Sequence, residues 1–463
     1  MGLHLRIIIA TVLLAVSLAG AQTSPIVDLG YAQYQGVVNP ANNITHFLGI
    51  RYAAAPLGDL RFRGAATAGQ HDRCTAGHER AQCLQGTSGT SPTNPFETRA
   101  TEDIPAEDCL FLNVYYPSNA VGAPRSKLPT LVWIHGGGYV SGAASGYDEE
   151  DIINQSARGV VVVSIQYRLG VFGKPAIFFP RFFGSSRWVQ LQGKASFLAF
   201  EIHIEYIKYN SCTSATDPMS CLRAVDANTL RAVNTNITAA PFFGTFVMVP
   251  VVDGVFIQQR PTLSLAEGKV NGEALLSVAN SFEGTIFVNQ NVAITAAQYS
   301  LELFPGFGTD QADIVSAMYA NDGDELFQVN AVQGESIFIC PTYYLLNAFP
   351  GRSFKGEFAI PPGLHGEDIA YYFPGGVAPP FNNPAFIDAF AQSFTSFIVN
   401  QDPNLKVDPT TITPHWNAFD NLYTEMLFNK TADNEPVVQP IFASGDLLER
   451  CAVWDSMGIF TSQ

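Results

Sequence analysis

A run of glycines that follows a strongly apolar stretch is the first place in this sequence where the backbone itself could do chemistry. Residues 130–134 read Thr-Leu-Val-Trp-Ile, and His135-Gly-Gly-Gly138 comes directly after them. Glycine has no Cβ, so it lets a chain turn sharply and come close to a ligand. The run therefore predicts either a ligand site lined by backbone or a plain turn at the end of a buried strand.

Cysteines are the other residues whose type and spacing suggest chemistry, and they stand at positions 74, 83, 109, 212, 221, 340 and 451. An odd number leaves at least one of them unpaired in an oxidised chain. Cys212 and Cys221 enclose a short polar loop, which predicts a local disulfide. Metal binding is the alternative, but no other His or Cys stands at ligand spacing around this pair.

Two apolar runs predict the strands that must position the glycine turn. Residues 130–134 and 160–165 are nearly continuous in apolar residues, which is typical of strands that are covered on both faces. They imply an α/β fold with a central sheet and helices on either side. Residues 385–399 predict a late amphipathic helix, with aromatic side chains at helical spacing at Phe386, Phe390, Phe394 and Phe397. Without an internal repeat or a linker, we expect one domain over residues 22–463.

The composition limits the class of protein. Of 463 residues, 47% are hydrophobic and 14% are charged, so the chain can bury a large core and is not disordered as a whole. The formal net charge of -16 disfavours nucleic acid and anionic membrane surfaces as partners, because both would repel the protein. A neutral or cationic small substrate is compatible with this charge.

The N-terminus predicts export. Arg6 precedes an apolar run, and Ala19-Gly-Ala21 fits a cleavage site, so we expect residues 1–21 to be a signal peptide. A membrane anchor is the alternative, but the run is short for a bilayer. The mature protein is then secreted and extracellular, without a stable membrane anchor. Four sequons would be glycan acceptors on this route, at Asn43, Asn154, Asn236 and Asn429.

Residues 174–211 differ in composition from the rest of the chain. They hold five of the 25 basic residues and six phenylalanines, with only Glu201 and Glu205 as acids. They also have little of the Gly, Asp and Asn punctuation that marks turns elsewhere. In an acidic protein this segment is a local reversal of composition.

Five separate stretches of the sequence carry a resemblance. They are residues 47–62, residues 107–114, the glycine run together with residues 166–173, the Cys212 and Cys221 loop, and the surroundings of Glu283 and His365 with Pro414-His-Trp416 behind them. In this order they resemble the type B carboxylesterase family, which includes fungal lipases and cholinesterases. Residues 174–211 match no part of the pattern.

The resemblance implies an α/β-hydrolase with a central, mostly parallel sheet flanked by helices. It also implies hydrolysis of carboxylic esters, with a small-molecule or lipid ester as substrate and no metal or organic cofactor. The family's pattern favours Cys83 over Cys74 as the disulfide partner of Cys109. Lipase and short-chain esterase activity both stay open, and the oligomeric state is not readable.

Ester hydrolysis in this fold needs a nucleophile, a base, an acid that orients the base, and N–H donors for the oxyanion. His365 resembles the family's catalytic histidine, and Glu283 resembles its acid; the order of acid before histidine is that of α/β-hydrolases. Gly137 and Gly138 match the residues that offer oxyanion-hole N–H groups. The plain alternatives are an ordinary histidine, a solvated loop carboxylate and a simple turn.

The nucleophile is missing from this pattern. The serine elbow needs Gly-x-Ser-x-Gly, whose small residues allow a tight turn from strand to helix, and this pattern occurs nowhere in the chain. Ser186 follows Gly184 at the right distance, but Arg187 and Trp188 stand where small residues should be. Ser336 in Gly334-Glu-Ser336 is followed by Ile and Phe.

We therefore expect that residues 174–211 replace a longer block that carried the elbow, its helix and the next strand, through a wrong exon boundary. The chain would then be inactive as written, and its neighbouring strand edges would be unpaired. The alternative function is that of a non-catalytic, esterase-like protein for binding or adhesion.

Overall fold

A computed structural model describes most of the chain. The described residues are 24–70, 74–76 (backbone only), 82–91, 106–173, 208, 211–250, 252, 254–291 and 293–461. The expected signal peptide and Ser186 lie outside the described residues, as does nearly all of the segment 174–211.

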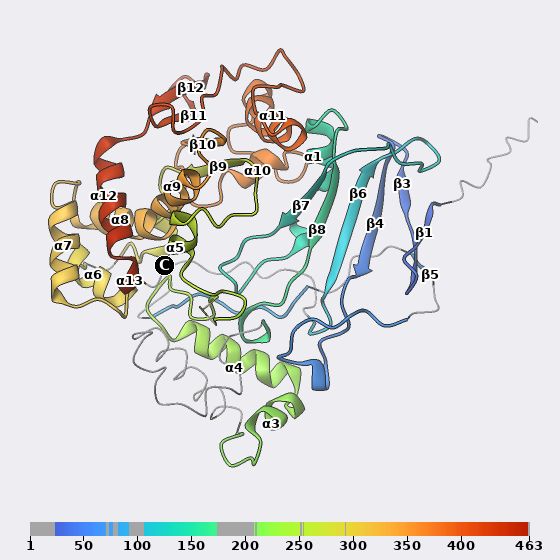
Figure 1. Cartoon of the computed structure of the whole chain (residues 1–463), viewed down its shortest axis with the longest axis horizontal. Coiled ribbons are helices and arrows are strands. Elements are labelled where there is room, and N and C mark those ends of the chain that lie inside the picture. Colours follow the sequence, from blue (N-terminus) through green and yellow to red (C-terminus); the bar gives the residue numbers. More distant parts are fainter. Residues whose placement is uncertain are drawn as a thin grey trace, which may run out of the picture.

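A five-stranded sheet dominates the N-terminal part, in the strand order β3-β4-β6-β8-β7 (Figure 1). Its strands are β3 (Val37–Asn39), β4 (Ile44–Arg51), β6 (Phe111–Pro117), β7 (Thr130–Ile134) and β8 (Val161–Ile165). Strands β7 and β8 are parallel, and the other pairs are antiparallel. A separate small sheet consists of β1 (Ile26–Asp28), β2 (Gln33–Gln35) and β5 (Cys74–Ala76).

A four-stranded sheet forms in the C-terminal part, in the order β12-β11-β10-β9. Its strands are β9 (Leu275–Asn280), β10 (Ser353–Phe358), β11 (Thr424–Lys430) and β12 (Pro436–Phe442). The pairs β9–β10 and β10–β11 are parallel, while β11 and β12 form an antiparallel hairpin. The described sheets are thus mixed: parallel pairing is found towards β7 and β9, and antiparallel pairing, which short turns can connect, lies further out.

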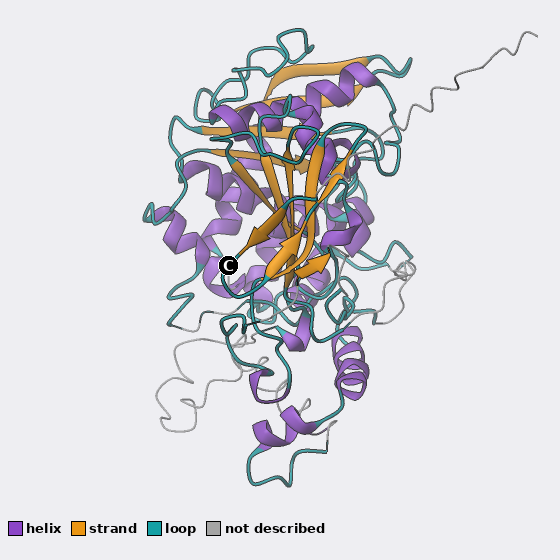
Figure 2. Cartoon of the chain, turned by 90° about the vertical axis from the view of Figure 1, so that its right-hand side faces the viewer, coloured by secondary structure: helices purple, strands orange, loops and turns teal. Residues whose placement is uncertain are grey.

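Helices lie on both sides of the strands (Figure 2). They are α1 (Glu149–Gln155), α3 (Pro218–Ala224), α4 (Ala227–Ala239), α5 (Pro261–Ala266), α6 (Ala296–Leu303), α7 (Thr309–Tyr319), α8 (Glu325–Gly334), α9 (Cys340–Asn347), α10 (Ile369–Tyr372), α11 (Pro384–Asn400), α12 (Gly445–Ser456) and α13 (Gly458–Thr461). Short 3-10 turns occur at Gly58–Leu60, Ala144–Gly146, Gly170–Phe172 and Thr285–Phe287, and a π-helix occupies Glu335–Ile339. The predicted α/β class is confirmed, but the described strands form separate mixed sheets and not one central, mostly parallel sheet.

The predicted late helix is α11, and its aromatic face builds a core. The Asn383 side chain accepts a hydrogen bond from the Phe386 N–H and so caps the first turn. Phe386 and Phe390 are fully buried, and they pack against Phe358 of β10 and Phe428 of β11. Spacing of aromatic residues on one helical face thus fixes the helix on the four-stranded sheet.

Strand β7 is covered on one face only, so the prediction of burial on both faces is wrong for residues 130–134. Trp133 packs edge-on against Phe373. Val132 and Ile134 point to the opposite face and are 50% and 62% exposed. Within the described chain β7 pairs with β8 alone, and it therefore lies at the edge of its sheet.

Three disulfides connect described side chains. Cys83 pairs with Cys109, Cys212 with Cys221, and Cys340 with Cys451. The first is the pairing that the resemblance favours, and the second closes the polar loop. The third joins residues separated by 111 positions, and the spacing of the cysteines did not predict it.

Candidate active site

His365 and Glu283 lie in direct contact. Nδ1 of His365 is 2.5 Å from Oε2 of Glu283. Glu283 is 5% exposed, so it is not a solvated loop carboxylate, while the side chain of His365 keeps 39% of its surface exposed. A buried carboxylate on Nδ1 fixes the tautomer of the ring and directs Nε2 away from the acid. In the part of the chain that the structure describes, Nε2 of His365 has no hydrogen-bond partner.

The pair meets because its two loops follow neighbouring strands. Glu283 follows β9 and His365 follows β10, and these strands are parallel, so their carboxyl ends lie at the same edge. The Phe282 N–H donates to the carbonyl of Gly363 at 2.9 Å and joins the two loops. Gly284 packs against α8, where an added Cβ would lie 2.1 Å from the Asn330 carbonyl oxygen.

A buried polar network holds Glu283. The backbone N–H of Asn280 donates to Oε1 of Glu283 at 2.6 Å, and the Asn280 amide donates to the same oxygen at 3.3 Å and to Asp368 at 3.0 Å. The Tyr372 hydroxyl donates to the other oxygen of Asp368. Burial, and more weakly repulsion from Glu283, raises the pKa of Asp368. Asn280 and Asp368 were not predicted from the sequence. Their only signal in the sequence is that each lies three positions from a member of the candidate pair, Asn280 from Glu283 and Asp368 from His365.

The glycine turn after β7 requires glycine at the two predicted positions. Gly137 has φ +125° and Gly138 has φ +59°, both in the region that side chains disfavour. An added Cβ on Gly137 would lie 1.9 Å from the Ser141 carbonyl oxygen, and one on Gly138 would lie 2.2 Å from the ring of Phe246. Among the described residues, the N–H groups of Gly137 and Gly138 have no acceptor. They are thus free to donate to a ligand.

His135, at the start of this turn, is held by its neighbours and has a structural role. Its ring is buried and stacks on Tyr167 at a centroid distance of 4.3 Å, and the Tyr167 hydroxyl donates to the His135 carbonyl. Burial lowers the pKa of His135. The buried, stacked ring and the hydrogen bond from Tyr167 therefore anchor the start of the turn.

Aromatic rings connect the glycine turn to the candidate pair. Phe246, which touches Gly138, contacts Phe287 at a centroid distance of 5.9 Å, and Phe287 contacts His365 at 5.1 Å. Phe338 contacts the imidazole at 4.6 Å. The structure thus brings the predicted base and acid together and separates them from the glycine turn by only two rings.

No serine hydroxyl of the described residues bonds to the imidazole. Ser186 lies outside these residues. Ser336 is buried in the π-helix, and its hydroxyl donates to the Val332 carbonyl at 2.6 Å. The candidate site therefore contains an acid, a base and N–H donors in the described chain, but no nucleophile.

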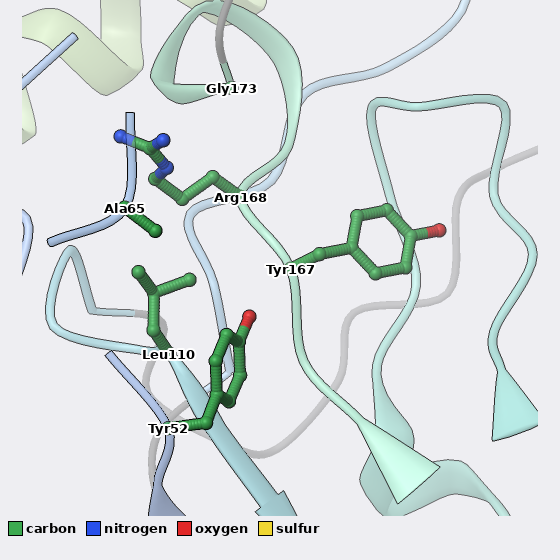
Figure 3. Close-up of a pocket in the computed structure, with 6 residues that line it drawn as sticks. All are labelled: Tyr52, Ala65, Leu110, Tyr167, Arg168 and Gly173. Carbon is green, nitrogen blue, oxygen red and sulfur yellow. The ribbon is translucent and has the colours of Figure 1, made fainter. Parts of the chain in front are cut away.

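A pocket of about 230 Å³ lies next to Gly173, the last described residue before the segment 174–211 (Figure 3). Its walls are Tyr52, Ala65, Leu110, Tyr167, Arg168 and Gly173. The Tyr52 hydroxyl donates to the Gln166 carbonyl, and Arg168 donates to the Arg63 carbonyl. Neither His365 nor Glu283 lines this pocket, so it is separate from the candidate site.

The sequence profile described as "Carboxylesterase family" matches residues 23–176 and 190–440. Only residues 177–189 are left out between the two matches, so the expectation that all of residues 174–211 match no part of the family's pattern is wrong for residues 174–176 and 190–211. A likeness in fold is also found: a crystal structure of EstA from Aspergillus niger superimposes with a TM-score of 0.78 over 96% of this chain and 100% of that one, at 21% identity.

Curated relatives agree with the profile. "Carboxylesterase patB" of Aspergillus clavatus is 24% identical over 509 positions, which cover 83% of this chain and 89% of that protein. "Carboxylesterase patB" of Penicillium expansum is 23% identical over 555 positions, covering 94% and 96%. "Carboxylesterase 1D" of Rattus norvegicus is 40% identical over 148 positions, covering 31% and 25%.

Proposed function

Because the chain belongs to the carboxylesterase family, we propose that it is a secreted carboxylic ester hydrolase that has lost its serine nucleophile together with the strand that carried it. Small-molecule or lipid esters are the substrates of the complete enzyme. The chain as written is inactive. One observation carries this proposal. Glu283 and His365 are in contact, but among the described residues no hydroxyl group bonds to Nε2 of His365.

Each retained group has a role in acyl transfer by the complete enzyme. Glu283 accepts the Nδ1 proton of His365 and stabilises the imidazolium. Nε2 of His365 takes the proton of the serine as the hydroxyl attacks the ester carbonyl, and it later returns a proton to the leaving alkoxide. Gly137 and Gly138 donate their N–H groups to the oxyanion of the tetrahedral intermediate.

Two unpaired strand edges support the loss of a strand. Among the described strands, β7 pairs only with β8 and β9 only with β10, so each lies at the edge of its sheet. The glycine turn follows β7, and Glu283 follows β9. One strand parallel to both would therefore end between the N–H donors and His365, where a serine at its end could reach both. Its helix would cover Val132 and Ile134, which are exposed.

The lengths of the relatives also support a lost block. The alignment with the Penicillium expansum carboxylesterase spans 555 positions, whereas this chain has 463 residues, so at least 92 positions have no counterpart here. A strand, an elbow and a helix need far fewer residues than that. A deficit of this size therefore leaves room for the lost block, and a wrong exon boundary within residues 174–211 would explain both its loss and the unusual composition.

A second candidate function is binding or adhesion without catalysis. The missing serine favours it, because removal of the nucleophile costs a serine hydrolase about a millionfold in turnover. The buried network around Glu283 argues against it, since a binding protein has no need for a carboxylate held on a histidine. Transcript sequencing is the first test: a transcript that encodes Gly-x-Ser-x-Gly between residues 173 and 212 supports the hydrolase, and one that reproduces the present segment supports the binding role.

Secretion is part of the same proposal. Three disulfides are typical of exported proteins, and the N-terminal sequence fits a signal peptide over residues 1–21. Asn154 and Asn236 are exposed and suit glycans best, whereas Asn43 and Asn429 are half-buried. No described helix is long and apolar enough to cross a bilayer.

A further inference from the structure

Helices α8 and α9 are joined by a π-helix, Glu335–Ile339, which faces the candidate base. Such turns are rare and frequently occur at functional sites. Phe338 in this turn packs on the imidazole of His365 at 4.6 Å and on Phe287 at 5.1 Å. Phe287 also contacts the imidazole, so the two rings and the base form one cluster.

The start of the π-helix is held by an ion pair from the C-terminal helix. Arg450 of α12 donates from Nε and Nη2 to the two carboxylate oxygens of Glu335, each at 2.7 Å. The Tyr319 hydroxyl donates to Glu335 at 2.8 Å, and Trp454 of α12 donates to that hydroxyl. A bidentate pair of this kind fixes geometry as well as charge.

The end of the π-helix is held by the next residue of α12. Cys451 forms a disulfide with Cys340, which directly follows the π-helix. The Tyr344 hydroxyl donates to the Cys451 carbonyl at 2.6 Å. Two adjacent residues, Arg450 and Cys451, therefore fix both ends of the same turn.

The anchors matter because a π-helix can relax. A regular helix advances about 100° per residue, so loss of the extra residue in the turn would rotate Phe338 away from the imidazole by about that angle. Burial of the Glu335 and Arg450 charges adds little net stability by itself, but it selects one arrangement of the turn.

We propose that α12 positions the candidate base: Arg450 and Cys451 hold the π-helix so that Phe338 packs on His365 and keeps its imidazole on Glu283. The inference rests on the proposed function only in taking His365 as the base. Arg450 and Phe338 are positioning residues, because they act on His365 and not on the reacting ester.

The test uses NMR on the full chain and needs no serine. We expect the Nδ1 proton between His365 and Glu283 to resonate far downfield, and its exchange with solvent would report how often the pair opens. Phe338→Ala removes the ring, and we expect about three- to tenfold faster exchange, the range that the loss of one aromatic contact corresponds to. Phe338→Tyr keeps the ring and should restore slow exchange.

Arg450 is tested in the same way. Arg450→Gln together with Glu335→Gln removes both charges of this pair, so that only the partly exposed Asp322 loses its ion-pair partner. The double variant should accelerate exchange to a similar extent. Ser444→Ala is the matched control, because Ser444 caps α12 at the Leu447 N–H but does not touch the π-helix. It should leave the exchange unchanged.

The outcomes separate the two proposals. Equal exchange in the parent and the double variant overturns the role of α12, as does an equal acceleration in Ser444→Ala, which would report general loosening of the helix. A folded parent that lacks the downfield proton overturns this inference and the proposed function together.

Discussion

The ring of Phe246 fills the space next to Gly138, so that a Cβ at position 138 would lie 2.2 Å from the ring. The positive φ of 59° adds backbone strain to this clash. We predict that Gly138→Ala lowers the free energy of unfolding by about 1–3 kcal/mol, measured by urea denaturation. Gly136→Ala is the control, since nothing lies within 4 Å of its added Cβ, and it should cost well below that. Equal losses in the two variants would contradict the description of the turn.

The exposed face of β7 gives a second prediction. Val132 is 50% exposed, while Val162 of β8 is fully buried. Val132→Thr should change stability by at most about 0.5 kcal/mol in the chain as it stands, whereas Val162→Thr should cost about 1–3 kcal/mol. In a chain with the lost block restored, both substitutions should be costly. A large loss from Val132→Thr in the present chain would mean that this face is already covered.

Asp151 predicts a pH dependence of stability. Burial, together with the neighbouring acids Asp148 and Glu150, raises the pKa of its carboxyl to about 6, although Gly375 donates an N–H to it. A raised carboxyl pKa favours the protonated group in the folded state, so its stabilisation is present below about pH 4 and is lost as pH rises through about 6. Relative to Asp151→Asn, the parent should lose about 1 kcal/mol between these limits, after allowance for solvent screening. Parallel pH profiles of the two proteins in urea unfolding would contradict this.

Asn280 should matter for catalysis once the serine is restored. Its backbone and side chain hold Glu283, and its side chain joins Glu283 to Asp368. We predict that Asn280→Ala lowers kcat by about ten- to hundredfold with little change in KM, as loss of a supporting hydrogen bond commonly does. Ser281→Ala is the control, because the Ser281 hydroxyl bonds to Glu357 instead. Similar kcat values for the two variants would exclude a positioning role for Asn280.

Much of the architecture can be predicted from the sequence, because it depends on local patterns of residues. Helix α11 follows from the spacing of Phe386 and Phe390, and the disulfide of Cys212 and Cys221 follows from a short polar loop. The exposure of Val132 does not follow, since an apolar run predicts a strand but says nothing about its neighbours.

The candidate site is harder to predict from the sequence, because contacts between residues far apart in the chain form it. The contact between Glu283 and His365 was expected from motifs, but the support from Asp368 depends on a loop 88 residues away from Asn280. The π-helix is set by a contact between Glu335 and Arg450, which are 115 residues apart, and no local signal marks it.

The central claim, that an intact acid–base pair lacks its nucleophile, is tested most directly by a fluorophosphonate probe. The purified chain is compared with a version in which residues 174–211 are replaced by the block that the Aspergillus clavatus relative carries between its counterparts of Gly173 and Cys212. We predict no labelling of the folded chain as written and about one label per molecule in the restored version, lost again in His365→Ala. Stoichiometric labelling of the chain as written would contradict the account, because a working serine would then already be present.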